Sequence, residues 1–122
     1  MKIFTQINEN NKILQLNKTQ LYLLGIPYSM YKEYGQYKED WKSLSNEDIQ
    51  KLEKTQEFLN DHMDDKTLKI SYGKLNSEIL FGIKKICQIS LNHQSDLDKD
   101  DKNLYKEILN TIYYEGSKKY NN

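Results

Sequence analysis

One segment, KLNSEILFGIKKICQISL at positions 74–91, limits the choice of fold more than any other part of the chain. On a helix its apolar side chains would cover a wide arc, because they fall on one side and on the rows beside it. These side chains are Leu75, Ile79, Leu80, Ile83, Ile86, Cys87 and Leu91. So broad an apolar face needs more than one neighbour. We therefore expect a central helix that several other elements contact.

Two amphipathic segments are expected to pack against this helix. The first begins at Ser45, which forms a capping-box-like start with Asp48, and its apolar seam is Ile49, Leu52, Leu59 and Met63, interrupted by Gln56. The second begins in DLDKDD, and its stripe is Leu104, Tyr105, Ile108, Leu109, Ile112 and Tyr113. An apolar fraction of 37% leaves no surplus for a second core. We expect one compact domain over 1–116 and a polar, frayed tail over 117–122.

Short strands are predicted at two places. KIFTQI and KILQL flank the polar turn NENN and predict an N-terminal β-hairpin. TLKISY alternates Leu68, Ile70 and Tyr72 with polar residues, which predicts a third strand near 67–72 that pairs with the hairpin. The expected fold class is α+β and mainly helical, with four to five helices in a small bundle.

The segment NKTQLYLLGIPYSMYKEY is expected to form two helices. Asn17 is a good N-cap and Gly25 a good C-terminal stop. Pro27 suits the first turn of a following helix, which would bend at Gly35. This arrangement resembles the helix-turn-helix family, and the resemblance implies that the second helix enters the major groove of DNA. The residues that would then face DNA are Tyr28, Ser29, Lys32 and Glu33.

Aromatic residues recur every three or four positions in PYSMYKEYGQYKEDW. A spacing of three drifts by about 60° per step on a helix, so the rings sweep half of its circumference. They cannot all face a small core, and we expect one or two rings to be partly exposed. A docking surface for another protein and half-buried packing are the two interpretations. The candidate partner-binding residues are Tyr28, Tyr31, Tyr34, Tyr37, Lys38 and Trp41.

Charge favours a protein as the partner. The chain has 18 basic and 18 acidic residues and contains no Arg. Nucleic-acid binding depends on clustered cations, and Arg is the side chain best suited to contacts with guanine and phosphate. Our hypothesis is a non-enzymatic protein that occupies a surface of a protein partner. A DNA-binding regulator is the alternative, and a homodimer is compatible with both.

Few side chains are suited to catalysis. His62 and His93 are expected at helix ends beside acids, where the helix dipole favours an imidazolium. Cys87 lies on an apolar helix face, where a thiol is usually inert. The sequence has no glycine-rich phosphate loop and no nucleophile-elbow motif. We expect neither enzymatic activity nor a cofactor.

The acidic stretch DLDKDDKNLYKE suggests a third class of function. Asp96, Asp98, Asp100 and Glu107 occupy the first, third, fifth and twelfth positions of a loop that resembles a calcium-binding EF-hand. Asp101 stands where that loop needs glycine. The alternative is that the Asp residues cap the following helix and oppose its dipole.

Composition also suggests where the protein works. Ala and Val are absent, like Arg, while Lys, Asn, Ile and Tyr abound, as expected of an AT-rich genome. No apolar run has the length of a signal peptide or a membrane-spanning helix, and a single cysteine allows no intrachain disulfide. We expect a cytoplasmic protein without membrane partners. A small AT-rich gene suggests a phage or mobile-element accessory factor that inhibits a host complex.

Overall fold

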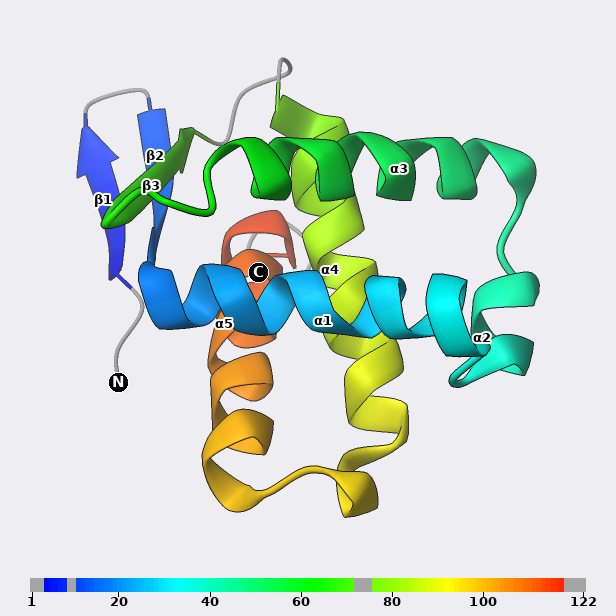
Figure 1. Ribbon diagram of the computed structural model, residues 1–122. Helices are drawn as coiled ribbons and strands as arrows, with labels where there is room; N and C mark the ends of the chain where they lie inside the picture. Colours follow the sequence, from blue (N-terminus) through cyan, green and yellow to red (C-terminus); the bar gives the residue numbers. More distant parts are fainter. Residues whose placement is uncertain (1–3, 9–10, 72–75, 118–122) are drawn as a thin grey trace.

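The computed structural model describes residues 4–8, 11–71 and 76–117. This part of the chain is mainly helical, with a small antiparallel sheet at its N-terminal side (Figure 1). The elements in chain order are β1 (Phe4–Asn8), β2 (Asn11–Asn17), α1 (Lys18–Tyr34), α2 (Lys38–Lys42), α3 (Asn46–Asp61), β3 (Thr67–Ser71), α4 (Ser77–Asn92), the short 3-10 helix η2 (Gln94–Asp96) and α5 (Lys99–Ser117). The expected α+β class is confirmed. Apart from Ser117, the predicted polar tail lies outside the described residues.

The sheet contains both predicted elements, the hairpin and the third strand. Its strand order is β1-β2-β3, and both pairs are antiparallel. Leu14 of β2 lies opposite Ile70 of β3, and Leu16 lies opposite Leu68. All four side chains are buried because alternate residues of a strand point to the same face. Tyr72, the last residue of the strand prediction, is outside the described residues.

The helices cross one another around α4. In Figure 1, α1 and α3 run side by side across α4 and α5, and the sheet lies at one end of α1 and α3. Helix α4 contacts α1, α3 and α5, and its Ile83, Ile86 and Cys87 are fully buried. The expected central helix is therefore present. Gly82 permits the close approach of α3, since a Cβ there would lie 1.8 Å from Thr55 Oγ1.

Helix α1 is a single helix, so the prediction of two helices separated by a turn is wrong. Its start is as expected: Asn17 Oδ1 accepts a hydrogen bond from the Gln20 N–H at 2.9 Å, and Gln20 Oε1 accepts one from the Asn17 N–H at 2.8 Å. Gly25 and Pro27 lie inside the helix, which ends only at Gly35. Glycine and proline both disfavour a helix interior. Contacts with the rest of the fold must therefore keep α1 continuous.

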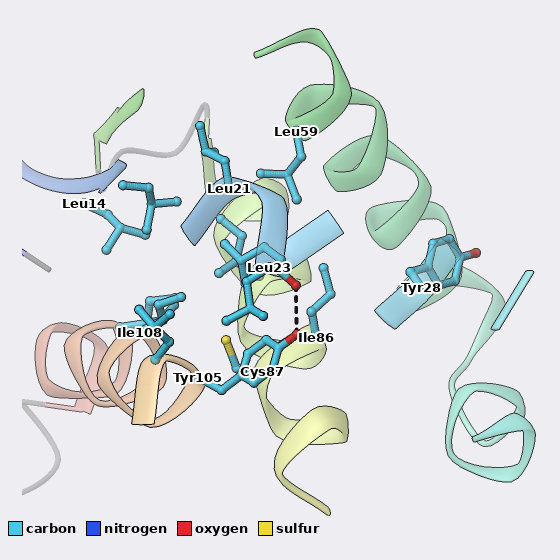
Figure 2. Close-up of a cluster of buried hydrophobic side chains, with 14 of the residues drawn as sticks. Leu14, Leu21, Leu23, Tyr28, Leu59, Ile86, Cys87, Tyr105 and Ile108 are labelled. Atoms are coloured by element: carbon cyan, nitrogen blue, oxygen red, sulfur yellow. Dashed lines mark hydrogen bonds between the residues drawn. The ribbon is translucent and has the colours of Figure 1, made fainter. Parts of the chain in front are cut away.

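The main such contact lies beneath Pro27. Proline has no N–H, so the carbonyl of Leu23, one turn earlier, loses its usual helical donor. The hydroxyl of Tyr105 on α5 donates to this Leu23 oxygen at 2.8 Å, as Figure 2 shows. Tyr105 is buried, and burial raises the pKa of its phenol, so the hydroxyl keeps its proton. Helix α5 thereby supplies the hydrogen bond that Pro27 removes from α1.

We expect Tyr105→Phe to lower the free energy of unfolding by about 1–3 kcal/mol, because the buried Leu23 carbonyl would lose its donor. In a Pro27→Ala background the new backbone N–H can bond this carbonyl, so the same change should cost less. Urea denaturation of wild type, both single variants and the double variant measures the difference. Equal losses in the two backgrounds would show that the hydroxyl does not compensate for the proline.

Candidate protein-docking surface

The aromatic row predicted from the sequence does not lie on one helix. Gly35 is left-handed, with φ 72°, and its N–H donates to the Tyr31 carbonyl at 2.8 Å, which ends α1. Tyr37 is also left-handed, with φ 57°, and precedes α2. The predicted bend at Gly35 is therefore a helix end. The rings are divided between α1, the turn after it, and α2.

Three rings of the row pack against one another inside the fold. The ring centroids of Tyr28 and Trp41 are 5.2 Å apart, and those of Tyr31 and Trp41 are 5.9 Å apart and stacked. Tyr28 is 3% exposed and Trp41 is 0% exposed. For these residues the structure favours packing, because two of the three have almost no surface to offer a partner.

Tyr37 is held at the end of α4. Its ring stacks on His93 with centroids 3.7 Å apart, and its hydroxyl donates to Asp96 Oδ2 at 2.9 Å. His93 Nε2 lies 3.1 Å from Asp40 Oδ2 on α2. These contacts join α2 to the residues that follow α4, and they offset the cost of a left-handed tyrosine. Lys38, at the start of α2, is exposed.

Tyr34 is the ring of the row that faces solvent. It ends a series of apolar residues, spaced four apart on the outward side of α1, that we call the outer stripe: Tyr22, Ile26, Met30 and Tyr34. Tyr34 is 73% exposed, Tyr22 64% and Ile26 36%, while Met30 is half-buried. Side chains at i and i+4 are neighbours on a helix, so the four form a ridge. The expected break at Gly25 hides this spacing in the sequence, so the first three residues were not among the predicted site residues.

A hollow of about 240 Å³ lies beside the outer stripe, between α1 and α3. Tyr22, Ile26 and Met30 form part of its lining. The other lining residues are Gly25, Ser29, Glu33, Gln56, Asn60 and Met63. Gly25 has a steric role here, because a Cβ at this position would lie 2.8 Å from Met63 Cε. The small residues on α1 thus make room beside the stripe.

Gln56, which interrupts the apolar seam of α3, joins the two helices at this hollow. Its Nε2 donates to the Gly25 carbonyl at 3.2 Å and to Ser29 Oγ at 3.1 Å. Its Oε1 is buried and has no hydrogen-bond partner in the described part of the chain. Buried amide oxygens usually have one. This oxygen is therefore an acceptor that the contacts between α1 and α3 leave unused.

A charged cluster connects α1 to α3 near the hollow. Glu53 accepts a hydrogen bond from the Tyr28 hydroxyl and another from Lys32 Nζ at 3.2 Å. The bond from Tyr28, supported by Lys32, lowers the pKa of Glu53, while burial and the same bond raise the pKa of Tyr28. Lys32 is thus paired, and the exposed Glu33 is the charged residue that lines the hollow.

Because the pKa of Glu53 is lowered, its carboxylate stabilises the folded state when the pH is above 4.5, the ordinary pKa of glutamate. This contribution is lost as the pH falls below that value. Glu53→Gln preserves the shape of the side chain and removes its charge. We expect wild type to melt at a higher temperature than the variant above pH 4.5, and the two to converge in more acidic solution. A difference in melting temperature that does not change with pH would contradict this assignment.

A second hollow, of about 250 Å³, lies on the other side of the outer stripe and includes Leu97 and Tyr105 in its lining. Ile26 and Met30 line both hollows. The middle of the stripe is therefore a ridge with a depression on each side. Ridges and grooves of this kind are the surface features by which helices pack against each other.

The acidic stretch begins α5. Asp98 Oδ1 accepts a hydrogen bond from the Asp101 N–H at 2.8 Å, as an N-cap does. Asp96 instead accepts a hydrogen bond from the hydroxyl of Tyr37. Among residues 4–8, 11–71 and 76–117, no three His, Cys, Asp or Glu side chains form a group that could hold a metal ion. The four predicted calcium ligands Asp96, Asp98, Asp100 and Glu107 are thus not assembled into such a group.

A cap and a cation ligand respond differently to substitution of Asp98. Asn caps helices as well as Asp does, so Asp98→Asn should leave the free energy of unfolding nearly unchanged, whereas Asp98→Ala should lower it by about 1 kcal/mol. Millimolar calcium should not shift the thermal melt of wild type. A calcium-induced rise in melting temperature that Asp98→Asn abolishes would restore the cation site.

The other reactive side chains are also engaged. His62 ends α3, and its Nδ1 lies 2.7 Å from Asp65 Oδ2. Both histidines therefore lie at helix ends beside acids, as expected. Cys87 is fully buried, and burial raises the pKa of its thiol. A larger, open hollow of about 720 Å³ beside α2 is lined in part by Asp40 and Ser43, but Ser43 Oγ donates to the Asp40 carbonyl at 2.7 Å. Polar groups that satisfy one another in this way are typical of structural contacts.

The residues predicted to face DNA have other roles. Tyr28 is buried, Ser29 Oγ accepts a hydrogen bond from Gln56, and Lys32 pairs with Glu53. Only Glu33 of the four is both exposed and without a partner described above, and it is an anion. Because α1 has no turn at Gly25, the helix-turn-helix prediction is wrong.

Comparisons with known proteins do not narrow the function. No family model, curated protein or solved structure matches the chain. Within the described ranges, none of the helices combines the length and apolar character needed to cross a membrane. The outer stripe and its flanking hollows are the features from which a function can be argued.

Proposed function

We propose that this protein is a non-enzymatic binding protein that occupies a surface of another protein through the outer stripe of α1. The observation that carries the proposal is the row of Tyr22, Ile26, Met30 and Tyr34, whose two terminal tyrosines are 64% and 73% exposed beside a hollow of about 240 Å³. A contiguous exposed apolar surface of this kind is typical of a protein interaction site.

The chemistry of the surface favours a protein over a nucleic acid. Tyrosine offers a large, rigid contact area and is enriched among the residues that contribute most to protein interfaces. The charged residue that lines the hollow is Glu33, which would repel a phosphate. Lys32, beside Glu33 on α1, is already paired with Glu53 at 3.2 Å. The chain carries no net charge that would attract a polyanion.

The biological setting is part of the proposal. The protein acts in the cytoplasm as an accessory factor of a phage or mobile element, and it inhibits a host complex by covering one of its surfaces. What supports this setting is the composition, which lacks Ala, Val and Arg, as expected of an AT-rich genome. Inhibition by occupancy needs no catalytic group, which agrees with the mutual pairing of the polar side chains described above.

The test is capture of partners from the native host with wild type, with Tyr22→Ser/Tyr34→Ser, and with the exposed control Asn110→Ser on α5. A protein that co-purifies with wild type and with the control, but not with the double variant, is the expected result. Titration of that purified protein should then show a loss of at least about 30-fold in affinity, since one anchoring tyrosine contributes about 2 kcal/mol.

The thermal melt separates docking from packing. Both tyrosines are mostly exposed, so the double variant should melt close to wild type. If the double variant captures the same proteins as wild type, the outer stripe is not the docking surface. If its melting temperature falls sharply, the two rings belong to the packing of the fold.

A further inference from the structure

We infer that the outer stripe binds a basic amphipathic helix of its partner protein. The apolar row of that helix packs along the stripe, and its Lys or Arg side chains reach carboxylates on both sides. This inference rests on the proposed function and deepens it, because it assigns a chemistry to the partner of the same surface. The observation behind it is the distribution of charge around the stripe.

Hollows flank the stripe on both sides of α1. Helix α3 lies on one side of α1, and the segment from η2 to the start of α5 lies on the other (Figure 1). The hollow of about 240 Å³ belongs to the α3 side and the hollow of about 250 Å³ to the α5 side. A third hollow, of about 470 Å³, is lined by Thr19 and by residues of α5. Because Thr19 precedes Tyr22 by three residues, this hollow lies near the Tyr22 end of the stripe.

The charged residues that line the three hollows are all acidic. Among the described lining residues there is no Lys, Arg or His, although the chain contains 18 basic residues. Glu33 lies on the α3 side of the stripe, and the other acids lie on the α5 side. The six acids are Glu33, Asp96, Asp98, Asp100, Asp101 and Glu107. A chain without net charge therefore has a locally anionic surface around its exposed apolar ridge.

The cations of α1 and α5 lie outside these hollows. Lys32 is paired with Glu53 at 3.2 Å, and Lys18 is exposed beside Thr19. Within the described ranges, the lining of the three hollows contains none of the following residues: Lys18, Lys32, Lys99, Lys102 and Lys106. Cations for this surface must then come from a partner.

The carboxylates at the start of α5 are crowded. Burial, together with the charges of Asp98 and Asp100, raises the pKa of Asp101. A cation placed among these groups would relieve their repulsion. Asp96 accepts one hydrogen bond from Tyr37, and Asp98 accepts one from the Asp101 N–H. A carboxylate can accept about four hydrogen bonds, so these contacts leave capacity for a cation.

A helix matches the shape of this surface. The stripe spans roughly 18 Å from Tyr22 to Tyr34, at 1.5 Å per residue, and a ridge between hollows is the form into which another helix packs. On an amphipathic helix the rows beside the apolar row point to either side, towards the two flanks of the stripe. Four of the six acids line the hollow near Tyr22. The cations of the partner should therefore be concentrated at the end that meets Tyr22.

Synthetic peptides test the chemistry of the occupant. The probe is a fluorescent Ala-based helix of about 15 residues, long enough to span the stripe, with Leu at every fourth position and Lys on both neighbouring rows. A matched peptide carries Glu in place of every Lys. By anisotropy the Lys peptide should bind at least about tenfold more tightly than the Glu peptide, since several exposed ion pairs contribute together. Its affinity should fall as salt is added.

A scrambled peptide tests the helix. It has the composition of the Lys peptide but no apolar row, so it should bind more weakly. Equal binding of the two would show that charge alone holds the peptide and would overturn the inferred helix.

Charge variants test the two flanks. Glu33→Gln/Asp100→Asn removes one exposed carboxylate from each side of the stripe and should weaken the Lys peptide by about threefold or more, with a smaller dependence on salt. Glu39→Gln/Glu47→Gln removes the same charge from exposed residues that line none of the three hollows, and it should bind like wild type. Melting curves of both variants confirm that each is folded.

Three results would overturn the inference: no measurable binding of the Lys peptide, equal binding of the Lys and Glu peptides, or equal losses in the two charge variants. Tyr22→Ser/Tyr34→Ser should greatly weaken the Lys peptide. If this variant binds it like wild type, the acids act without the stripe, and the inferred site is wrong.

The outcomes also separate this inference from the proposed function. A captured protein that depends on Tyr22 and Tyr34, but binds Glu33→Gln/Asp100→Asn as tightly as wild type, overturns the basic partner and leaves the docking surface intact. Conversely, binding of the Lys peptide that depends on both the stripe and the acids supports the inference. If no partner can be captured in that case, the proposed inhibitor is removed and the preference of the surface stands.

Discussion

The hydrogen bond from the Tyr105 hydroxyl to the Leu23 carbonyl is the contact on which the architecture of α1 depends. Pro27 would otherwise leave a buried carbonyl without a donor in the middle of that helix. Because α5 supplies the donor, α1 continues to Tyr34 and carries apolar side chains on its outward face as well as its inward face. The same contact ties α1 to α5, the helix that lies across it.

Two further contacts determine which face of α1 is left open. Gln56 bonds the Gly25 carbonyl and Ser29 Oγ, and Glu53 bonds Tyr28 and Lys32, so α3 is attached along one side of α1. On the inner side Tyr28 packs with Trp41. With these sides occupied, the row that begins at Tyr22 remains at the surface. The outer stripe is what the packing of the other faces leaves uncovered.

Most of the polar side chains described above make contacts within the fold. Asp98 caps α5, Asp96 and His93 hold Tyr37, and Glu53 carries a lowered pKa because Tyr28 and Lys32 favour its charged form. An exposed apolar ridge, by contrast, gains free energy when another surface removes it from water. This contrast is why we propose that the protein acts by binding through the outer stripe.

The sequence by itself determined the elements whose signals are local: the α+β class, the hairpin and third strand, the caps at Asn17 and Ser45, and the wide apolar face of α4. Each depends on periodicity or on hydrogen bonds within a few residues. Only the tertiary structure decided the course of α1, because the donor that compensates for Pro27 comes from a tyrosine far along the chain. The candidate site changed for the same reason. Tyr34 could be predicted from its place in the aromatic row, but Tyr22, Ile26 and Met30 form a stripe with it only on an unbroken helix. Tyr28 and Trp41 lie in the interior because of neighbours that the local sequence does not reveal.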